Sequence, residues 1–191
     1  MSPSDLLRGN RVRLTALTPD DLPTLAQWYQ DAELLRLFDS RPAFPKAQTE
    51  LALWLEEVNK AKDTFTFGIR LLDGDELLGY LELDEIDWQH GVCGLGVGIG
   101  DRVNWGLGHG FEAVKLGLQF AFHELNLHRV QVTVFAYNGP SLALFEKLGF
   151  QREGVYREFL QRDGQRHDMI LYGLLRHEWQ MQQDTHRSSS P

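Results

Sequence analysis

A glycine-rich turn near the middle of the chain has the composition of an anion-binding loop. Residues Trp105–Gly110 read WGLGHG and lead into an apolar stripe with helical spacing that begins at Phe111. Such a turn leaves several backbone N–H groups unpaired beside the positive end of a helix dipole, which suits a phosphate or pyrophosphate. The segment lacks the lysine of a P-loop, and its third glycine comes one residue too early for the dinucleotide-binding fingerprint.

A row of glycines precedes this turn. Glycine occupies every second position from Gly94 to Gly100, in a segment that alternates like a strand, so the four glycines share one face of that strand. Each of them destabilises the strand by about 0.5–1 kcal/mol relative to alanine. We expect either a close approach of a ligand or another backbone, or tight packing against a helix.

Three carboxylates are candidates for a general base. Glu82 and Asp84 share one face of a predicted strand, and Glu158 lies on a later strand. A carboxylate can take a proton from an amine, directly or through water. The competing interpretation for each is an ordinary solvated charge, because strand acids are mostly exposed.

Histidine and cysteine give weaker signals. We expect His109 to pack over the glycine-rich turn, and His167 to pair with Asp168 across a hairpin. The single cysteine, Cys93, excludes an intrachain disulfide and a multi-cysteine zinc site and fits a reducing compartment. No base is adjacent to it, which favours a buried thiol over an acylated nucleophile.

The composition is that of one globular domain. The chain has 191 residues, of which 42% are hydrophobic, a size that folds without disulfides or a structural metal. A net charge of −8 disfavours nucleic acid as a partner. No apolar run reaches the roughly 20 residues of a membrane span, and residues 1–10 have no apolar signal core, so we expect a cytoplasmic protein without membrane partners. We expect the domain over residues 1–179 and a flexible tail over 180–191.

The hydrophobic pattern predicts an α+β fold with one mixed sheet. Thr18 and Pro19 mark the start of a first helix, which carries apolar residues up to Tyr29, and residues 38–45 read as a loop. The remaining predicted elements are a strand over 11–15, a helix over 46–60, a hairpin of strands 65–71 and 77–86, a strand over 92–99, a helix from about 108 to 125, a strand over 130–134, a helix over 138–148, and two strands, about 150–160 and 166–175.

The order of these motifs resembles the GNAT (Gcn5-related) N-acetyltransferases, in the RimJ/RimL-like branch that acetylates ribosomal-protein amino termini and spermidine-like amines. The resemblance is carried by the turn Trp105–Gly110 and by the run that begins at Asn138 and reads NGPSLALFEKLGFQREG. It implies a mostly antiparallel mixed sheet of about seven strands with helices on both faces. It also implies splayed central strands, between which the pantetheine arm of acetyl-CoA bonds to main chain, here at Val97 and Ile99.

The resemblance assigns roles to individual residues. The pyrophosphate would be held by the loop that starts at Trp105, through the amides of Gly106, Leu107, Gly108, His109 and Gly110. Asn138 would bind the pantetheine arm, and Ser141 would lie near the thioester. Phe145, which would also contact the cosubstrate, stands where many members have a tyrosine that protonates the leaving thiolate. Phenylalanine has no proton to donate, so Ser141 becomes the candidate acid.

These expectations combine into a function. We expect an acetyl-CoA-dependent N-acetyltransferase, without a metal, that acts by direct transfer to a primary amine in a ternary complex. The amine is either a protein amino terminus or a small amine, and a homodimer is the candidate assembly. Asp31, Glu33 and Asp39 would suit a cationic acceptor. A CoA-binding sensor that has lost turnover is the alternative, suggested by Phe145. A nicotinamide oxidoreductase is disfavoured by the glycine spacing and the hairpins.

Overall fold

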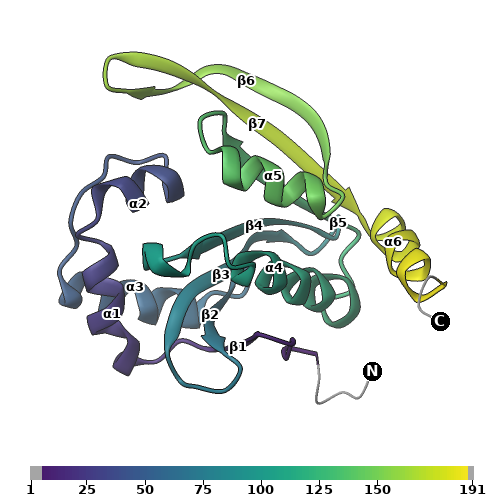
Figure 1. Ribbon diagram of the computed structural model, residues 1–191, viewed down its shortest axis with the longest axis horizontal. Coiled ribbons are helices and arrows are strands. Elements are labelled where there is room, and N and C mark those ends of the chain that lie inside the picture. Colours follow the sequence, from purple (N-terminus) through teal and green to yellow (C-terminus); the bar gives the residue numbers. More distant parts are fainter. Residues whose placement is uncertain (1–5, 189–191) are drawn as a thin grey trace.

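One seven-stranded sheet runs through the molecule, in the order β1-β2-β3-β4-β5-β7-β6 (Figure 1). The computed structural model describes residues 6–188. Neighbouring strands are antiparallel except for β4 and β5, which are parallel. This arrangement confirms the predicted mixed sheet. The strands are β1 Val12–Ala16, β2 Phe65–Leu71, β3 Leu77–Asp87, β4 Val92–Ile99, β5 Arg129–Phe135, β6 Gln151–Arg162 and β7 Gln165–Leu175.

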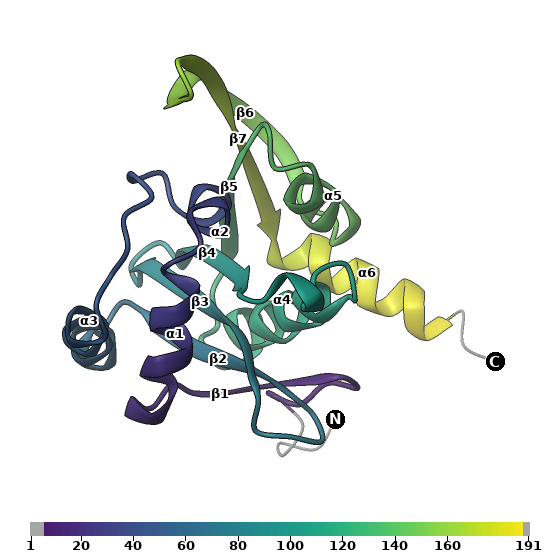
Figure 2. The same cartoon turned by 60° about the vertical axis from the view of Figure 1, so that its left-hand side comes forward.

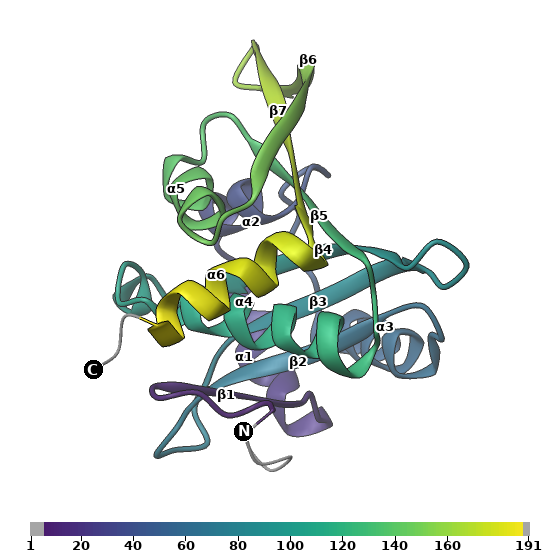
Figure 3. The same cartoon turned by 90° about the vertical axis from the view of Figure 1, so that its right-hand side faces the viewer.

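Helices cover both faces of the sheet, each over its own apolar core (Figures 2 and 3). On one face, α1, α2 and α3 enclose a core that includes Leu25, Leu51 and Tyr80. On the other face, α4, α5 and α6 cover a larger core that includes Leu81, Phe122 and Trp179. The helices are α1 Leu22–Trp28, α2 Ala32–Phe38, α3 Gln48–Lys60, α4 His109–Gln119, α5 Gly139–Lys147 and α6 Arg176–Ser188.

Two helices differ from the sequence-based expectation. Helix α2 was not predicted, although Asp31 caps it by accepting hydrogen bonds from the N–H groups of Glu33 and Leu34. Helix α6 extends through Ser188, so residues 180–188 are helical where we expected a tail from residue 180. Trp179, buried against the core, anchors this helix. The flexibility of this segment stays a prediction, and residues 189–191 lie outside the described residues.

The two parallel strands at the centre of the sheet diverge. Strand β4 pairs with β5 at three positions only, from Val92 opposite Arg129 to Gly94 opposite Gln131. Beyond Gly94, β4 continues to Ile99 and stays paired with β3 alone, whereas β5 stays paired with β7. The sheet therefore has an internal gap with a strand edge on each side, as the predicted splay requires.

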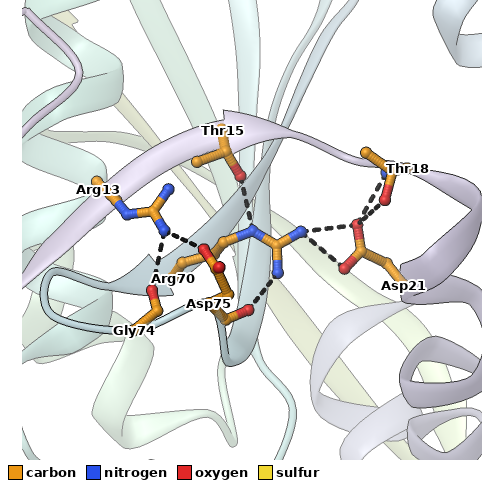
Figure 4. A network of polar contacts seen from close by, with 7 residues as sticks. All are labelled: Arg13, Thr15, Thr18, Asp21, Arg70, Gly74 and Asp75. Atoms are coloured by element: carbon orange, nitrogen blue, oxygen red, sulfur yellow. Dashed lines mark hydrogen bonds and ion pairs between the residues drawn. The ribbon is translucent and has the colours of Figure 1, made fainter.

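A polar network fastens the amino-terminal part of the sheet (Figure 4). The Arg70 guanidinium binds both carboxylate oxygens of Asp21, at 2.7 and 2.9 Å. It also donates to the Thr15 hydroxyl and to the backbone carbonyl of Asp75. Asp21 in turn accepts a hydrogen bond from the N–H of Thr18. The side chains of Arg70 and Asp21 are 12% and 6% exposed, so this ion pair is largely shielded from water.

Candidate active site

The predicted anion-binding loop joins the open end of β4 to helix α4. Gly106 and Gly108 both have positive φ, at 73° and 85°, a backbone conformation that glycine adopts at little cost. Trp105 anchors the loop because its indole N–H donates to the carbonyl of Ile99 at 2.8 Å. Within the described chain, no amide of residues 106–110 donates a hydrogen bond to another protein group. The loop therefore offers free N–H groups at the start of an 11-residue helix.

The glycine row on β4 has both of the expected surroundings, tight packing against helices at some positions and open space at another. A side chain at Gly98 would collide with the Phe38 ring of α2, and one at Gly100 with the Trp28 ring of α1, so these two glycines permit tight helix packing. A side chain at Gly96 would meet nothing within 4 Å. Gly96 therefore borders open space, as expected for the approach of a ligand.

Two carboxylates face this glycine row from the neighbouring strand. In the β3–β4 register, Glu82 lies opposite Gly96, and Asp84 lies opposite Gly94. Glu82 accepts a hydrogen bond of 2.9 Å from the Thr66 hydroxyl. Burial raises the pKa of Glu82 and the pKa of Asp84 above their usual values. This shift brings the pKa of each carboxyl group closer to the value that suits a general base near neutral pH.

A cleft of about 510 Å³ lies along the gap between β4 and β5. Its walls come from strands on both sides of the gap and from the residues that end α2, and four acidic residues contribute to its lining. Two of the four are already paired, since Asp39 binds Arg41 and Glu153 binds Arg129. The lining acids are Asp39, Asp84, Glu85 and Glu153.

The start of α5 lies beside the end of α2. Asn138 caps α5, because its side-chain oxygen accepts from the N–H of Ser141 at 3.2 Å. Its side-chain N–H donates to the carbonyl of Leu37, and the Tyr137 hydroxyl donates to the carbonyl of Arg36. Both groups of the Asn138 side chain are thus used within the protein, and its contact with the pantetheine arm stays a prediction.

The helix α2 is also held from the tip of the β6–β7 hairpin. Arg36 forms an ion pair with Asp163, and the Arg162 guanidinium donates to the backbone carbonyls of residues 39–41. These contacts join the carboxyl end of α2, which belongs to the amino-terminal part of the chain, to the β6–β7 hairpin of the carboxyl-terminal part (Figure 1). Sequence analysis missed them, because their partners lie more than 100 residues apart in the chain.

Phe145 belongs to the core. Its side chain is buried and packs edge-on against the Phe150 ring, with 5.2 Å between the ring centroids. Ser141 lies one turn earlier on the same helix and is partly exposed. Of these two residues, Ser141 keeps a hydroxyl that a reacting group can reach.

None of the three predicted catalytic residues, Glu82, Ser141 and Glu158, is among the residues that line the cleft. Glu158 lies on an exposed bulge of β6 with positive φ, and its N–H donates to the Asp168 carboxylate. His167 packs edge-on against the Tyr137 ring and does not pair with Asp168, since adjacent strand residues point to opposite faces. Cys93 is fully buried, and burial raises the pKa of its thiol to about 12.

His109 and two of the predicted acceptor-binding acids have defined surroundings. His109 is buried at the start of α4, and its Nδ1 atom has no hydrogen-bond partner among the described residues. Asp31 and Glu33 share the single cation Arg102, which offsets one of their two negative charges, and their role toward a cationic acceptor stays a prediction. The described residues include no group of three or more side chains placed to hold a metal ion, and no described helix is long and apolar enough to cross a membrane.

Arg11 is a further residue near the loop that sequence analysis missed. Its guanidinium donates to the carbonyl of Leu107 at 2.7 Å. The contact joins the first strand to a loop 96 residues later. The spacing of residues along the chain gives no signal for it, because it depends on β1 lying next to α4 in the folded structure.

Comparison with known proteins agrees with this geometry. Residues 11–151 match the family model described as "Acetyltransferase (GNAT) domain". An uncharacterized SPbeta prophage-derived N-acetyltransferase of Bacillus subtilis is 32% identical over 91% of this chain and 94% of its own length. The [ribosomal protein uS5]-alanine N-acetyltransferase of Escherichia coli is 27% identical over 74% of this chain and 73% of its own.

The fold also matches a solved structure of an enzyme with its ligands. The spermidine N-acetyltransferase of Vibrio cholerae, in complex with CoA and spermine, superposes with a TM-score of 0.81 over 88% of this chain and 98% of that chain. Its sequence is 21% identical, so this likeness concerns the fold.

Proposed function

The chain belongs to the GNAT family of N-acetyltransferases, and on that basis we propose that it transfers the acetyl group of acetyl-CoA directly to a primary amine in a ternary complex. One observation carries the proposal. The gap between β4 and β5 has a loop of free amides at one end and a cleft with carboxylates beside it. Such a gap can hold both substrates with their reacting atoms together.

On the donor side, free amides and an unpaired strand edge match the parts of CoA. The amides of residues 106–110 bind the pyrophosphate at the amino terminus of α4. Backbone groups of β4 at Val97 and Ile99 bond to the pantetheine arm, because this edge pairs with no strand beyond Gly94. The Ile99 carbonyl also accepts a hydrogen bond from the Trp105 indole. The arm then leads the thioester toward the narrow end of the gap.

On the acceptor side, Glu82 is the proposed base. It lies opposite Gly96, and the missing side chain at Gly96 leaves room for the amine. Its raised pKa helps it to take a proton from the substrate ammonium, directly or through a water molecule. We favour Glu82 over Glu158, which lies on the exposed bulge of β6.

The transfer then needs one bond formed and one broken. The amine nitrogen attacks the thioester carbonyl carbon, a tetrahedral intermediate forms, and the carbon–sulfur bond breaks. The Ser141 hydroxyl gives its proton to the leaving thiolate. The acetylated nitrogen loses its second proton to solvent, solvent returns a proton to Ser141, and Glu82 releases the proton that it took first. The products are an N-acetylated amine and CoA.

Both candidate classes of acceptor, a protein amino terminus and a small amine, are cations before they lose a proton. Asp84 and Glu85 in the cleft wall pair with no cation in the described part of the chain, which favours a positively charged acceptor. The names of two similar proteins cover both classes of acceptor: one is a ribosomal-protein alanine N-acetyltransferase and the other a spermidine N-acetyltransferase.

The test is CoA release from acetyl-CoA across polyamines, amino acids, aminoglycosides and peptides with varied amino-terminal residues. A hit that mass spectrometry confirms as an N-acetylated product supports the proposal, and the class of the hit identifies the acceptor. Release no faster than the hydrolysis blank with every acceptor, while acetyl-CoA still binds, would overturn turnover and favour a CoA-binding sensor.

A further inference from the structure

We propose that Arg11 is a positioning residue for the pyrophosphate loop: it fixes the direction of one loop amide and so determines affinity for the nucleotide end of acetyl-CoA. The proposal rests on the proposed function, because it concerns the same donor site. Arg11 touches neither of the reacting atoms in this account. It acts through Leu107 and Gly108.

The contact involves one carbonyl of the loop. Arg11 Nη1 donates to the Leu107 carbonyl oxygen at 2.7 Å. The same nitrogen lies 3.5 Å from the point where a side chain at Gly108 would begin. The guanidinium therefore sits directly against the last turn of the loop before α4.

Because the peptide bond is planar, this contact fixes the direction of the Gly108 N–H. The carbonyl of Leu107 and the N–H of Gly108 belong to one planar trans peptide, so they point in opposite directions. When Arg11 holds the carbonyl, the N–H of Gly108 points away from Arg11 and stays free of protein acceptors. Glycines with positive φ flank Leu107 on both sides, so the backbone alone leaves this peptide free to rotate.

Arg11 is itself anchored to the helix that follows the loop. The Glu112 carboxylate, in the first turn of α4, accepts hydrogen bonds from the N–H groups of Asn10, Arg11 and Val12 at 2.7, 2.9 and 3.1 Å. Gly9 has no side chain, and a Cβ there would lie 2.7 Å from this carboxylate. The start of β1 is thus tied to α4, and Arg11 spans the short distance from this tie back to the loop.

The charge of Arg11 supports the same assignment. In the described part of the chain its guanidinium pairs with no carboxylate. A guanidinium without a salt bridge beside a loop of free amides adds to the attraction of an anion. A purely structural arginine at the surface would not need its partner to be a loop carbonyl next to those amides.

The experiment compares two donors that differ in the nucleotide. Acetyl-CoA carries the pyrophosphate, and S-acetylpantetheine has the same thioester and arm without it. Arg11→Met is expected to raise KM for acetyl-CoA by about tenfold, the usual effect of losing a charged hydrogen bond, with kcat within about twofold. The kcat/KM for S-acetylpantetheine is expected to stay unchanged.

Arg13→Met is the matched control. Arg13 lies on β1, two residues after Arg11, but its guanidinium binds the carbonyl of Gly74 and the carboxylate of Asp75, away from the loop. It is expected to leave KM for both donors unchanged. Arg11→Lys keeps the charge but not the geometry, and is expected to recover only part of the loss.

Two outcomes would overturn the proposal. Arg11→Met could leave KM for acetyl-CoA unchanged, as Arg13→Met is expected to do, or it could lower the use of both donors equally. If the wild-type chain transfers no acetyl group at all, the proposed function fails by itself. Calorimetry then still tests the role of Arg11. The proposal predicts that Arg11→Met binds CoA more weakly and binds pantetheine as the wild-type chain does.

Discussion

The polar groups around Arg70 and those along the β4–β5 gap are organised in opposite ways. Arg70 makes hydrogen bonds through all three of its guanidinium nitrogens, to Asp21, Thr15 and the backbone of Asp75 (Figure 4). At the gap, the amides of residues 106–110 have no protein partner among the described residues, and β4 beyond Gly94 pairs with no strand on that side. The shielded polar groups of the first region are satisfied and serve stability, whereas the second region leaves backbone groups available to the proposed ligand.

The contrast predicts that mutations in the first region change folding and leave the chemistry intact. Arg70→Met leaves the carboxylate of Asp21 shielded and without its cation, and is expected to lower the free energy of unfolding by about 3–5 kcal/mol. Urea denaturation measures it. Arg13→Met, which breaks an ion pair to the 95%-exposed Asp75, is expected to lower it by at most about 1 kcal/mol. Equal losses in the two variants would remove the distinction between a shielded and an exposed pair.

Mutations in the second region are expected to change turnover and leave folding intact. Ser141→Ala removes the proposed acid and is expected to lower kcat by roughly 10²–10³-fold, with the melting temperature unchanged within about 2 °C. Ser141→Thr retains a hydroxyl and serves as the control. If alanine and threonine variants both keep the wild-type kcat, another group protonates the thiolate.

The pH dependence distinguishes the two regions further. Glu82 must be deprotonated to act as a base, and burial raises its pKa from the usual 4.5, so activity is expected to fall on acidification at a higher pH than for an exposed glutamate. Glu82→Gln is expected to lower kcat/KM by about 100-fold near neutral pH and to remove this acidic limb. A Glu82→Gln profile with the wild-type limb would exclude Glu82 as the base.

The ionised Glu82 carboxylate favours activity but lowers the stability of the folded state. A pKa that is raised in the folded state gives stability that is present below the unfolded value of 4.5 and is lost as the pH rises through the folded value. Glu82→Gln is therefore expected to raise the melting temperature at pH 8 and to leave it nearly unchanged at pH 4. Thermal unfolding at both pH values measures this difference.

Two glycines on one strand give the smallest expected effects. Gly98→Ala forces a side chain into the Phe38 ring and is expected to destabilise the fold by about 1–3 kcal/mol. Gly96→Ala meets open space and is expected to change stability by less than about 1 kcal/mol, while it raises KM for the amine. Urea denaturation and amine titrations separate the two. A loss of stability in Gly96→Ala equal to that in Gly98→Ala would mean that Gly96 is packed and does not border the acceptor path.

Local patterns in the sequence predicted most of the sheet. Strands β2 and β4 have the predicted bounds, Phe65–Leu71 and Val92–Ile99, because alternation of apolar residues is a local property. The glycine-rich loop before α4 was also predicted, since glycines before a helical stripe identify it, and its binding of an anion stays a prediction. Helix α2 was missed because it is only seven residues long and depends on distant groups, among them Tyr137 and Arg162.

The composition of the site was harder to predict than its location. Asp31 and Glu33 read as free acids, yet Arg102, about 70 residues away, pairs with both and offsets one of their two negative charges. Glu158 was a candidate base with a solvated charge as the alternative, and the structure places it on an exposed bulge of the edge strand, with positive φ. Arg11 gave no signal at all. In each case, the partner or the local backbone depends on the tertiary fold, which residue spacing does not specify.

Under the proposed function, the short pairing between β4 and β5 links the thermal stability of the protein to the supply of acetyl-CoA. Where the two strands part, each exposes a row of backbone groups that would be an edge in any other sheet. A donor that bonds to this edge in the folded state and not in the unfolded chain adds RT ln(1 + [L]/Kd) to stability, about 2.7 kcal/mol at 100 times Kd. The lifetime of the folded enzyme should therefore follow the supply of acetyl-CoA, and starvation for the donor would expose the protein to unfolding and proteolysis.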